Sequence, residues 1–110
     1  MEKKYKLKLE EESGLYRIVA LRDFRDVKAG DIGGLISDEK NLSQEGDAWV
    51  YGNAKVYMDA QVYGDAQVYG DAWVFGAAQV SGTAQVYGNA RVYGDAQVSG
   101  EARVHGIARV

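Results

Sequence analysis

Small and branched apolar residues recur along this chain with a period of six. Valine stands at every sixth position from 50 to 110, eleven times without an insertion, and alanine stands two residues before each valine. Residues two apart point to the same side of an extended strand. The pattern therefore predicts a series of short strands, each with one alanine and one valine facing inward.

The residues after each valine predict a corner. Glycine stands two positions after most of the valines, with Met58 as the one replacement, and Asp or Asn commonly comes next. Glycine adopts positive φ without strain, and Asp or Asn side chains bond to nearby backbone. Three strands and three corners would close a coil of eighteen residues, so we expect residues i and i+18 to stack about 4.8 Å apart.

The segment before residue 45 is less regular. We expect residues 1–29 to form an N-terminal β cap and residues 30–110 to form the repeat part, with clear repeats at 45–110. In the cap, the alternation at 5–9, a turn at 12–14 and a β-prone stretch at 15–21 predict a hairpin. Residues 30–44 are interpreted as a degraded first coil in the same six-residue frame, which holds Gly30, Ile32, Gly34, Ile36, Leu42 and Gly46.

A cluster of glycines lies in this first coil, within Gly30-Asp31-Ile32-Gly33-Gly34. It lacks the helix and the Lys-Ser/Thr pair of a phosphate-binding loop. We expect it to be a turn.

The repeat unit Tyr-Gly-Asp-Ala-Gln-Val, found at residues 63–68, resembles that of the hexapeptide-repeat, left-handed parallel β-helix proteins. It looks most like short members from phage and prophage genomes, and the resemblance covers residues 45–110. An all-β fold with a left-handed coil and a trimeric assembly is what the resemblance implies. Periodicity alone does not choose the hand of the coil.

Composition narrows the possible functions. The chain has no Cys, so thiolate metal sites and disulfides are excluded, and its formal charge is −3. Residues 45–110 carry four Lys or Arg against seven Asp or Glu, which is unlike a protein that binds duplex nucleic acid. No signal peptide or membrane span is predicted, so the expected location is the cytoplasm.

Stacking by eighteen residues sorts the outward side chains into columns on three faces. The first face carries Trp49, Gln67, Gln85 and Arg103, followed by Tyr51, Tyr69, Tyr87 and His105. The second face carries Lys55, Trp73, Arg91 and Arg109, followed by Tyr57, Phe75 and Tyr93. The third face carries Gln61, Gln79 and Gln97, whose amides we expect to be linked along the stack, followed by Tyr63, Ser81 and Ser99.

Exposed aromatic and arginine side chains on the first two faces indicate an interface or a ligand site. Nucleobases and phosphates are bound by aromatic rings and by fixed arginines. The candidate ligand-binding residues are Trp73, Arg91, Arg109, Arg103, Tyr69, Tyr87, Tyr57, Tyr93, Phe75 and His105. The alternative is that tyrosines suit strands and pack on one another or on a second subunit without any ligand.

The sequence offers little catalytic chemistry. Relatives that are acyltransferases use a histidine as a general base, and His105 is the single histidine here. The expected role of His105 is that of an exposed stacking residue. We assign no catalytic residue, no metal site and no cofactor.

These observations favour a non-enzymatic, homo-oligomeric binding protein. We expect a trimer, which would pair tail to tail into a hexamer through an uncapped C-terminal coil that ends at Val110. If the resemblance to phage proteins holds, the ligand would be a small anionic, nucleotide-like signal used in host immunity, sequestered without turnover. The alternatives are an acyltransferase-like enzyme and a purely structural assembly protein.

Overall fold

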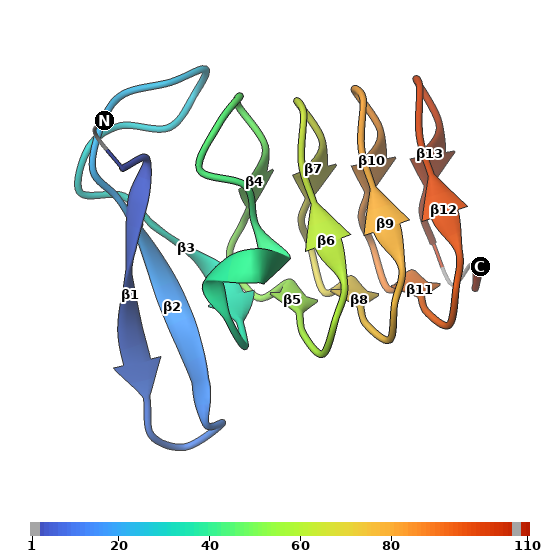
Figure 1. The fold of residues 1–110 in the computed structure, drawn as a ribbon, viewed down its shortest axis with the longest axis horizontal. Helices are drawn as coiled ribbons and strands as arrows, with labels where there is room; N and C mark the ends of the chain where they lie inside the picture. Colours follow the sequence, from blue (N-terminus) through green and yellow to red (C-terminus); the bar gives the residue numbers. More distant parts are fainter. Residues whose placement is uncertain (1–2, 107–108) are drawn as a thin grey trace.

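The computed structural model describes residues 3–106 and 109–110. The chain begins with three longer strands, β1 (Tyr5–Glu10), β2 (Leu15–Ala20) and β3 (Ile32–Ile36), and a short 3-10 helix, η1 (Glu39–Asn41). Ten strands of two residues each follow (Figure 1): β4 (Trp49–Val50), β5 (Lys55–Val56), β6 (Gln61–Val62), β7 (Gln67–Val68), β8 (Trp73–Val74), β9 (Gln79–Val80), β10 (Gln85–Val86), β11 (Arg91–Val92), β12 (Gln97–Val98) and β13 (Arg103–Val104).

The short strands wind into a left-handed parallel β-helix with three strands per coil (Figure 1). Each strand from β4 to β10 pairs in parallel with the strand eighteen residues further along, as Lys55 does with Trp73 and Trp73 with Arg91. Three sheets result: β4-β7-β10-β13, β6-β9-β12, and a six-stranded sheet in the order β1-β2-β3-β5-β8-β11. The predicted fold class and the eighteen-residue coil are confirmed.

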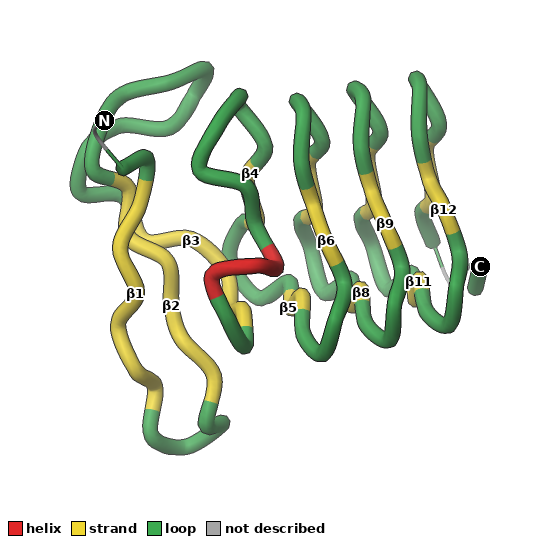
Figure 2. The backbone as a smooth tube through the Cα atoms, viewed as in Figure 1, coloured by secondary structure: helices red, strands yellow, loops and turns green. Residues whose placement is uncertain are grey.

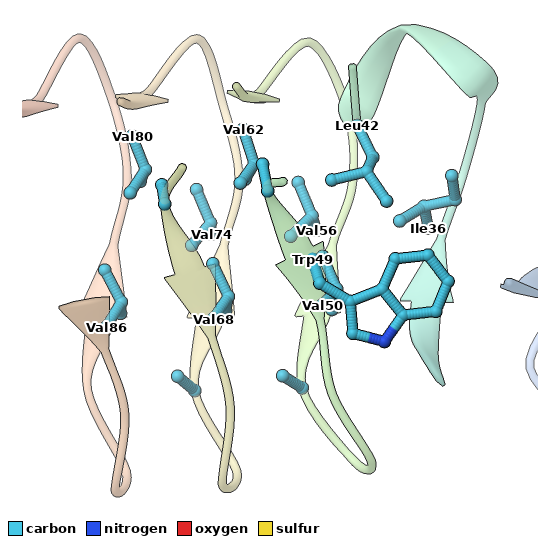
Figure 3. Packing of buried hydrophobic residues seen from close by; sticks show 14 of the residues in the cluster. Ile36, Leu42, Trp49, Val50, Val56, Val62, Val68, Val74, Val80 and Val86 are labelled. Atoms are coloured by element: carbon cyan, nitrogen blue, oxygen red, sulfur yellow. The ribbon is translucent and has the colours of Figure 1, made fainter. Parts of the chain in front are cut away.

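The core consists of the alanines and valines that the repeat predicts to face inward. Valines from Val50 to Val92 and alanines from Ala48 to Ala90 are fully buried or nearly so. Figure 3 shows the valines lying one behind another along the axis of the solenoid. Each buried valine contributes about 1.5–3 kcal/mol to folding. Ala108, which was also predicted to face inward, lies outside the described residues.

The corners are as tightly stacked as the strands (Figure 2). The corner glycines have positive φ, and most corners accept a backbone hydrogen bond from the coil before them, as Gly76 O does from Asp59 N at 2.9 Å. A Cβ placed on Gly76 would lie 2.8 Å from the backbone nitrogen of Gly94. Met58 is the one corner residue with a side chain in this conformation, at φ 59°, and its side chain is largely exposed.

The N-terminal hairpin covers the first coil, as predicted. Strands β1 and β2 pair antiparallel, β2 pairs antiparallel with β3, and β3 pairs in parallel with β5. The hairpin therefore adds two strands to one sheet of the solenoid as well as capping its first coil.

The hairpin also buries Trp49, which the eighteen-residue spacing predicts in an outward column. Trp49 is only 2% exposed, because the rings of Tyr5 and Phe24 pack edge-on against it at centroid distances of 6.2 and 5.3 Å. An outward position on the first complete coil becomes interior once the cap folds over it.

The expected six-residue frame of residues 30–44 is wrong by two residues. Ile36 pairs with Val56 and Leu42 with Val62, so both occupy the valine position and stand twenty residues from their partners. Ile32, expected inward, is 64% exposed. The reason is a longer corner: five residues lie between Leu42 and Ala48, whereas three lie between Val62 and Ala66.

The glycine cluster forms the expected turn only at its start, where Asp31 N donates to Lys28 O at 2.9 Å. Only Gly30 has positive φ, while Gly33 and Gly34 lie inside β3 at a register shift between β2 and β3. A Cβ on Gly33 would come within 2.6 Å of Val50 O, and one on Gly34 within 2.5 Å of a Val50 methyl carbon. The two glycines allow β3 to run directly against the coil that follows.

Polar groups are buried where the cap joins the solenoid. Asn41 donates hydrogen bonds to Ala60 O at 2.7 Å and to Met58 O at 3.1 Å, replacing the strand that would otherwise meet these carbonyls. The Lys4 ammonium donates to Ala48 O at 2.6 Å and lies 5.3 Å from the centre of the Phe24 ring. Burial, followed by the nearby charge of Arg22, lowers the pKa of Lys4 to about 8.

The amide column predicted on the third face is not found among the described residues. Gln61 and Gln97 are exposed, and no hydrogen bond joins either to Gln79. The amides pair instead on the first face, where Gln85 Nε2 donates to Gln67 Oε1 at 3.2 Å. Tyrosine hydroxyls on that face hold these amides in place.

In the described part of the chain, no helix has the length and apolar character needed to cross a membrane.

Because the corners stack, we expect the same substitution to destabilise the protein by different amounts at two corner glycines. Gly76→Ala and Gly94→Ala both force alanine into positive φ, at φ 70° and 63°, which costs about 1–2 kcal/mol. Only Gly76 also meets backbone of the next coil, whereas nothing lies within 4 Å of a Cβ on Gly94. Urea unfolding should show Gly76→Ala less stable than Gly94→Ala by about 1–3 kcal/mol. Equal losses would show that the corners tolerate a methyl group between coils.

The buried Lys4 predicts a rise in stability with pH. Between its folded pKa of about 8 and the ordinary lysine pKa of 10.5, the unfolded chain keeps the proton that the folded chain has lost. The free energy of unfolding should therefore rise between pH 8 and pH 10, with a slope of at most about 1.4 kcal/mol per pH unit. Above about pH 10 the buried Tyr5 opposes this rise, because burial raises its pKa and only the unfolded chain ionises there.

Urea unfolding at several pH values checks this expectation in the wild type, Lys4→Met and the exposed control Lys6→Met. The rise should disappear in Lys4→Met and persist in Lys6→Met. An identical pH profile for all three proteins would contradict the assignment.

Candidate functional site

The solenoid brings the predicted columns together on two separate faces. We call the outer surface of the six-stranded sheet the Trp73 face and the outer surface of β4-β7-β10-β13 the Tyr69 face. Of the ten candidate residues, the Trp73 face holds Trp73, Arg91, Arg109, Tyr57, Phe75 and Tyr93, and the Tyr69 face holds Tyr69, Tyr87, Arg103 and His105. The ten residues therefore do not form one continuous surface.

Three rings on the Trp73 face stack into a column. Phe75 lies parallel to Tyr57 and to Tyr93, with ring centroids 5.1 and 5.4 Å apart. The spacing is that of neighbouring strands, because each ring follows the valine of its own strand. Both faces of Phe75 are covered by its neighbours, so the column presents ring edges along its length and open ring faces only at its ends.

Trp73 lies between two cations of the adjacent strands. The Arg91 guanidinium carbon is 4.0 Å from the Trp73 ring centre, and the Lys55 ammonium is 5.5 Å from it. All three side chains are half-buried. Cation–π attraction of this kind contributes about 0.5–1 kcal/mol at exposed sites, and it restricts the positions that the two cations can take.

Arg91 is further fixed by the neighbouring corner. Its Nη1 donates to the carbonyl oxygens of Asn89 at 2.9 Å, Ala90 at 3.3 Å and Asp71 at 3.4 Å. The guanidinium is thus held against both the indole ring and the backbone, and its position is set before any ligand arrives.

Three surface hollows meet at Trp73. The largest, of about 410 Å³, contains the cations Arg17, Lys55 and Arg91 and is completed by Glu10, Leu35, Asn53, Asp71 and Trp73. The second, of about 260 Å³, is lined by Ser13, Leu15, Lys55, Tyr57 and Trp73. The third, of about 280 Å³, is lined by Trp73, Phe75, Arg91, Tyr93 and Arg109. Each hollow combines an aromatic ring with at least one cation.

The N-terminal hairpin contributes Arg17, which the repeat pattern does not predict at this site. Arg17 on β2 donates to Glu10 Oε2 at 3.0 Å, to Gly33 O at 3.1 Å and to Gly52 O at 2.6 Å. These bonds fix the hairpin against the solenoid and form one wall of the largest hollow. Only the pairing of β2 with β3, which no repeat pattern encodes, brings Arg17 to this position.

The Tyr69 face carries a second aromatic column. Tyr69 and Tyr87 are parallel at 4.8 Å, and His105 stacks on Tyr87 at 5.1 Å. Tyr51 meets Tyr69 edge-on at 6.1 Å. His105 is exposed, and it lies in the tyrosine column as predicted.

A hydrogen-bond chain runs beside this second column. Tyr51 donates its hydroxyl proton to Asp26 Oδ1 at 2.9 Å, and Gln67 Nε2 donates to the Tyr51 hydroxyl at 3.2 Å. Burial and the Asp26 carboxylate raise the pKa of Tyr51 to about 12. Asp26, Tyr51, Gln67 and Tyr69 line a hollow of about 360 Å³, which is neutral apart from one carboxylate.

Catalytic constellations are not evident in the described part of the chain. No three His, Asp or Glu side chains among these residues gather in a way that would hold a metal ion. The described contacts of His105 are to a tyrosine ring, on a different face from Trp73. Arg103 and Arg109 are both exposed.

The class of protein that this fold defines is the hexapeptide-repeat parallel β-helix. A family described as the YdcK β-solenoid repeat matches residues 66–82 and 84–100, and each matched stretch is close to one coil. The chain is also similar to the uncharacterized acetyltransferase YdcK of Escherichia coli strain K12, with 51% identity over 37 residues. That match covers 34% of this chain and 11% of the relative, so this chain spans only a small part of the relative's length.

Proposed function

We propose that this chain is a non-enzymatic binding protein that holds a small anionic, nucleotide-like ligand on its Trp73 face. The observation that carries the proposal is the convergence of three hollows on Trp73, each lined by an aromatic ring and a cation. A ligand with a phosphate and a planar ring would use both kinds of side chain.

The two hollows that share Lys55 suit different parts of such a ligand. The larger has three cationic and two acidic side chains, which suits an anionic group held between Lys55 and Arg91. The smaller is walled by Leu15, Tyr57 and Trp73, which suits an apolar planar group. Because Trp73 and the corner carbonyls already fix Arg91, little conformational freedom is lost on binding.

We also propose that the protein acts as a homo-oligomer, with a trimer as the basic unit. Tyr63 and Tyr93 remain more than a third exposed in the single chain, and aromatic side chains of this kind are enriched at interfaces between subunits. A cyclic trimer would repeat the same contact around its axis. Pairing of two trimers through their C-terminal coils stays part of the proposal.

Native mass spectrometry of the freshly purified protein is the test, since it reports the assembly and any retained small molecule together. We expect a trimer, or a hexamer, with extra mass from a small anionic compound. Trp73→Ala combined with Arg91→Ala should remove that mass and lower the affinity for added nucleoside phosphates by about 2–4 kcal/mol, from lost stacking and lost charged hydrogen bonds.

His105→Ala is the matched control, because its ring lies on the Tyr69 face and should leave nucleotide binding unchanged. A bare monomer without affinity for nucleoside phosphates would leave only a structural role for the chain.

A second candidate function is acyl transfer, which the similarity to YdcK favours because that protein bears the name of an acetyltransferase. His105, the single histidine of the chain, would have to act as its general base. Incubation with acetyl-coenzyme A and amine acceptors should then show turnover that His105→Ala abolishes. Turnover unaffected by His105→Ala, or none at all, would contradict this candidate.

A further inference from the structure

The six-stranded sheet aligns cationic residues from distant parts of the sequence in one row across its strands. Directly paired residues lead from Lys8 to Arg17, Leu35, Lys55, Trp73, Arg91 and finally Arg109. We call these seven residues the basic row. Five of the seven are Lys or Arg.

All members of the basic row lie on the outer side of the sheet. Paired residues on neighbouring strands share a face, and the next residues along the strands, Ile36 and Val56, are fully buried in the core. Lys8 and Arg109 are exposed at the two ends of the row. Leu35 is 3% exposed and forms part of the lining of the largest hollow.

The row is much longer than a mononucleotide site. Its six steps of about 4.8 Å give a length of about 29 Å. The hollows around Trp73 extend along it from Arg17 to Arg109, whereas Lys8 lies beyond them on the hairpin. Glu10 neutralises part of the charge of Arg17, at 3.0 Å, and Asp71 borders the central hollow.

An aromatic column accompanies the row. Tyr57, Phe75 and Tyr93 stand two residues further along the same strands, about 7 Å to the side of the row. The two smaller hollows join this column to the row, since each is lined by a cation together with rings. A line of charge and a line of planar apolar surface therefore run side by side along one face.

We propose that the basic row is a binding track for single-stranded nucleic acid, with the phosphodiester backbone along the cations and bases in the hollows beside them. This deepens the proposed function, on which it rests, by naming a ligand longer than one nucleotide. An acidic peptide would match the charges and leave the ring-lined hollows empty. A duplex would keep its bases stacked inside and out of reach of the hollows.

Fluorescence anisotropy with end-labelled oligo(dT) and oligo(U) tests the track. Strands of about six nucleotides should bind at least about ten-fold more tightly than dinucleotides, and more tightly than a duplex of the same length. The dependence of log K on log salt should steepen with strand length, by about 0.7 for each phosphate that meets a cation.

Variants at the two ends separate the track from the central site. Lys8→Gln and Arg109→Gln should each reduce the salt slope for six nucleotides by about 0.7. Lys8→Gln should also leave mononucleotide binding unchanged, because Lys8 lines none of the three hollows around Trp73. Lys28→Gln, which removes an exposed charge in the loop between β2 and β3, should change neither.

Three results would overturn the track, and the first two concern the track alone. One is an affinity that does not depend on strand length while mononucleotides still bind, which would leave the proposed function intact. Another is equally strong competition by poly-glutamate, which would show that charge alone is recognised. Absence of binding to every anion, mononucleotides included, would remove the proposed function and the track together.

Discussion

Every strand of the solenoid depends on hydrogen bonds to the coils before and after it, because a two-residue strand has no partner within its own coil. The bonds run along the axis through strands and corners alike, as from Trp73 N to Ala90 O and from Asp59 N to Gly76 O. Side chains that would separate the coils are therefore excluded from the interior and from most corners. Alanine, valine and glycine recur because they permit this stacking at about 4.8 Å.

The same constraint makes the first coil a special problem, since its outer edge would otherwise be left without partners. The hairpin solves this by pairing β2 with β3, while Asn41 and Lys4 bond to carbonyls that no strand reaches. The aromatic cluster around Trp49 fills the space above the first valines. The cap and the solenoid thus share one sheet and one core, and the Trp73 face gains Arg17 from the cap.

Sequence periodicity was sufficient to predict the coil, its core and the outward columns, because each of these repeats every eighteen residues. It could not predict features that depend on a single contact. The two-residue shift of Ile36 and Leu42 follows from one longer corner, and the burial of Trp49 follows from the cap. The packing of Arg91 on Trp73 depends on side-chain conformations, and Arg17 reaches the site through antiparallel pairing that no repeat encodes.

Strand pairing changes from antiparallel to parallel at β3, and this fixes where the solenoid begins. One edge of β3 is taken by an antiparallel strand and the other by a parallel one, so no further coil fits between cap and solenoid. Duplication of an eighteen-residue unit is accommodated only downstream, where it adds one strand to every sheet at once. Related proteins would then keep the same cap and differ in length by whole coils. Each added coil would lengthen all three surfaces of the solenoid by one strand.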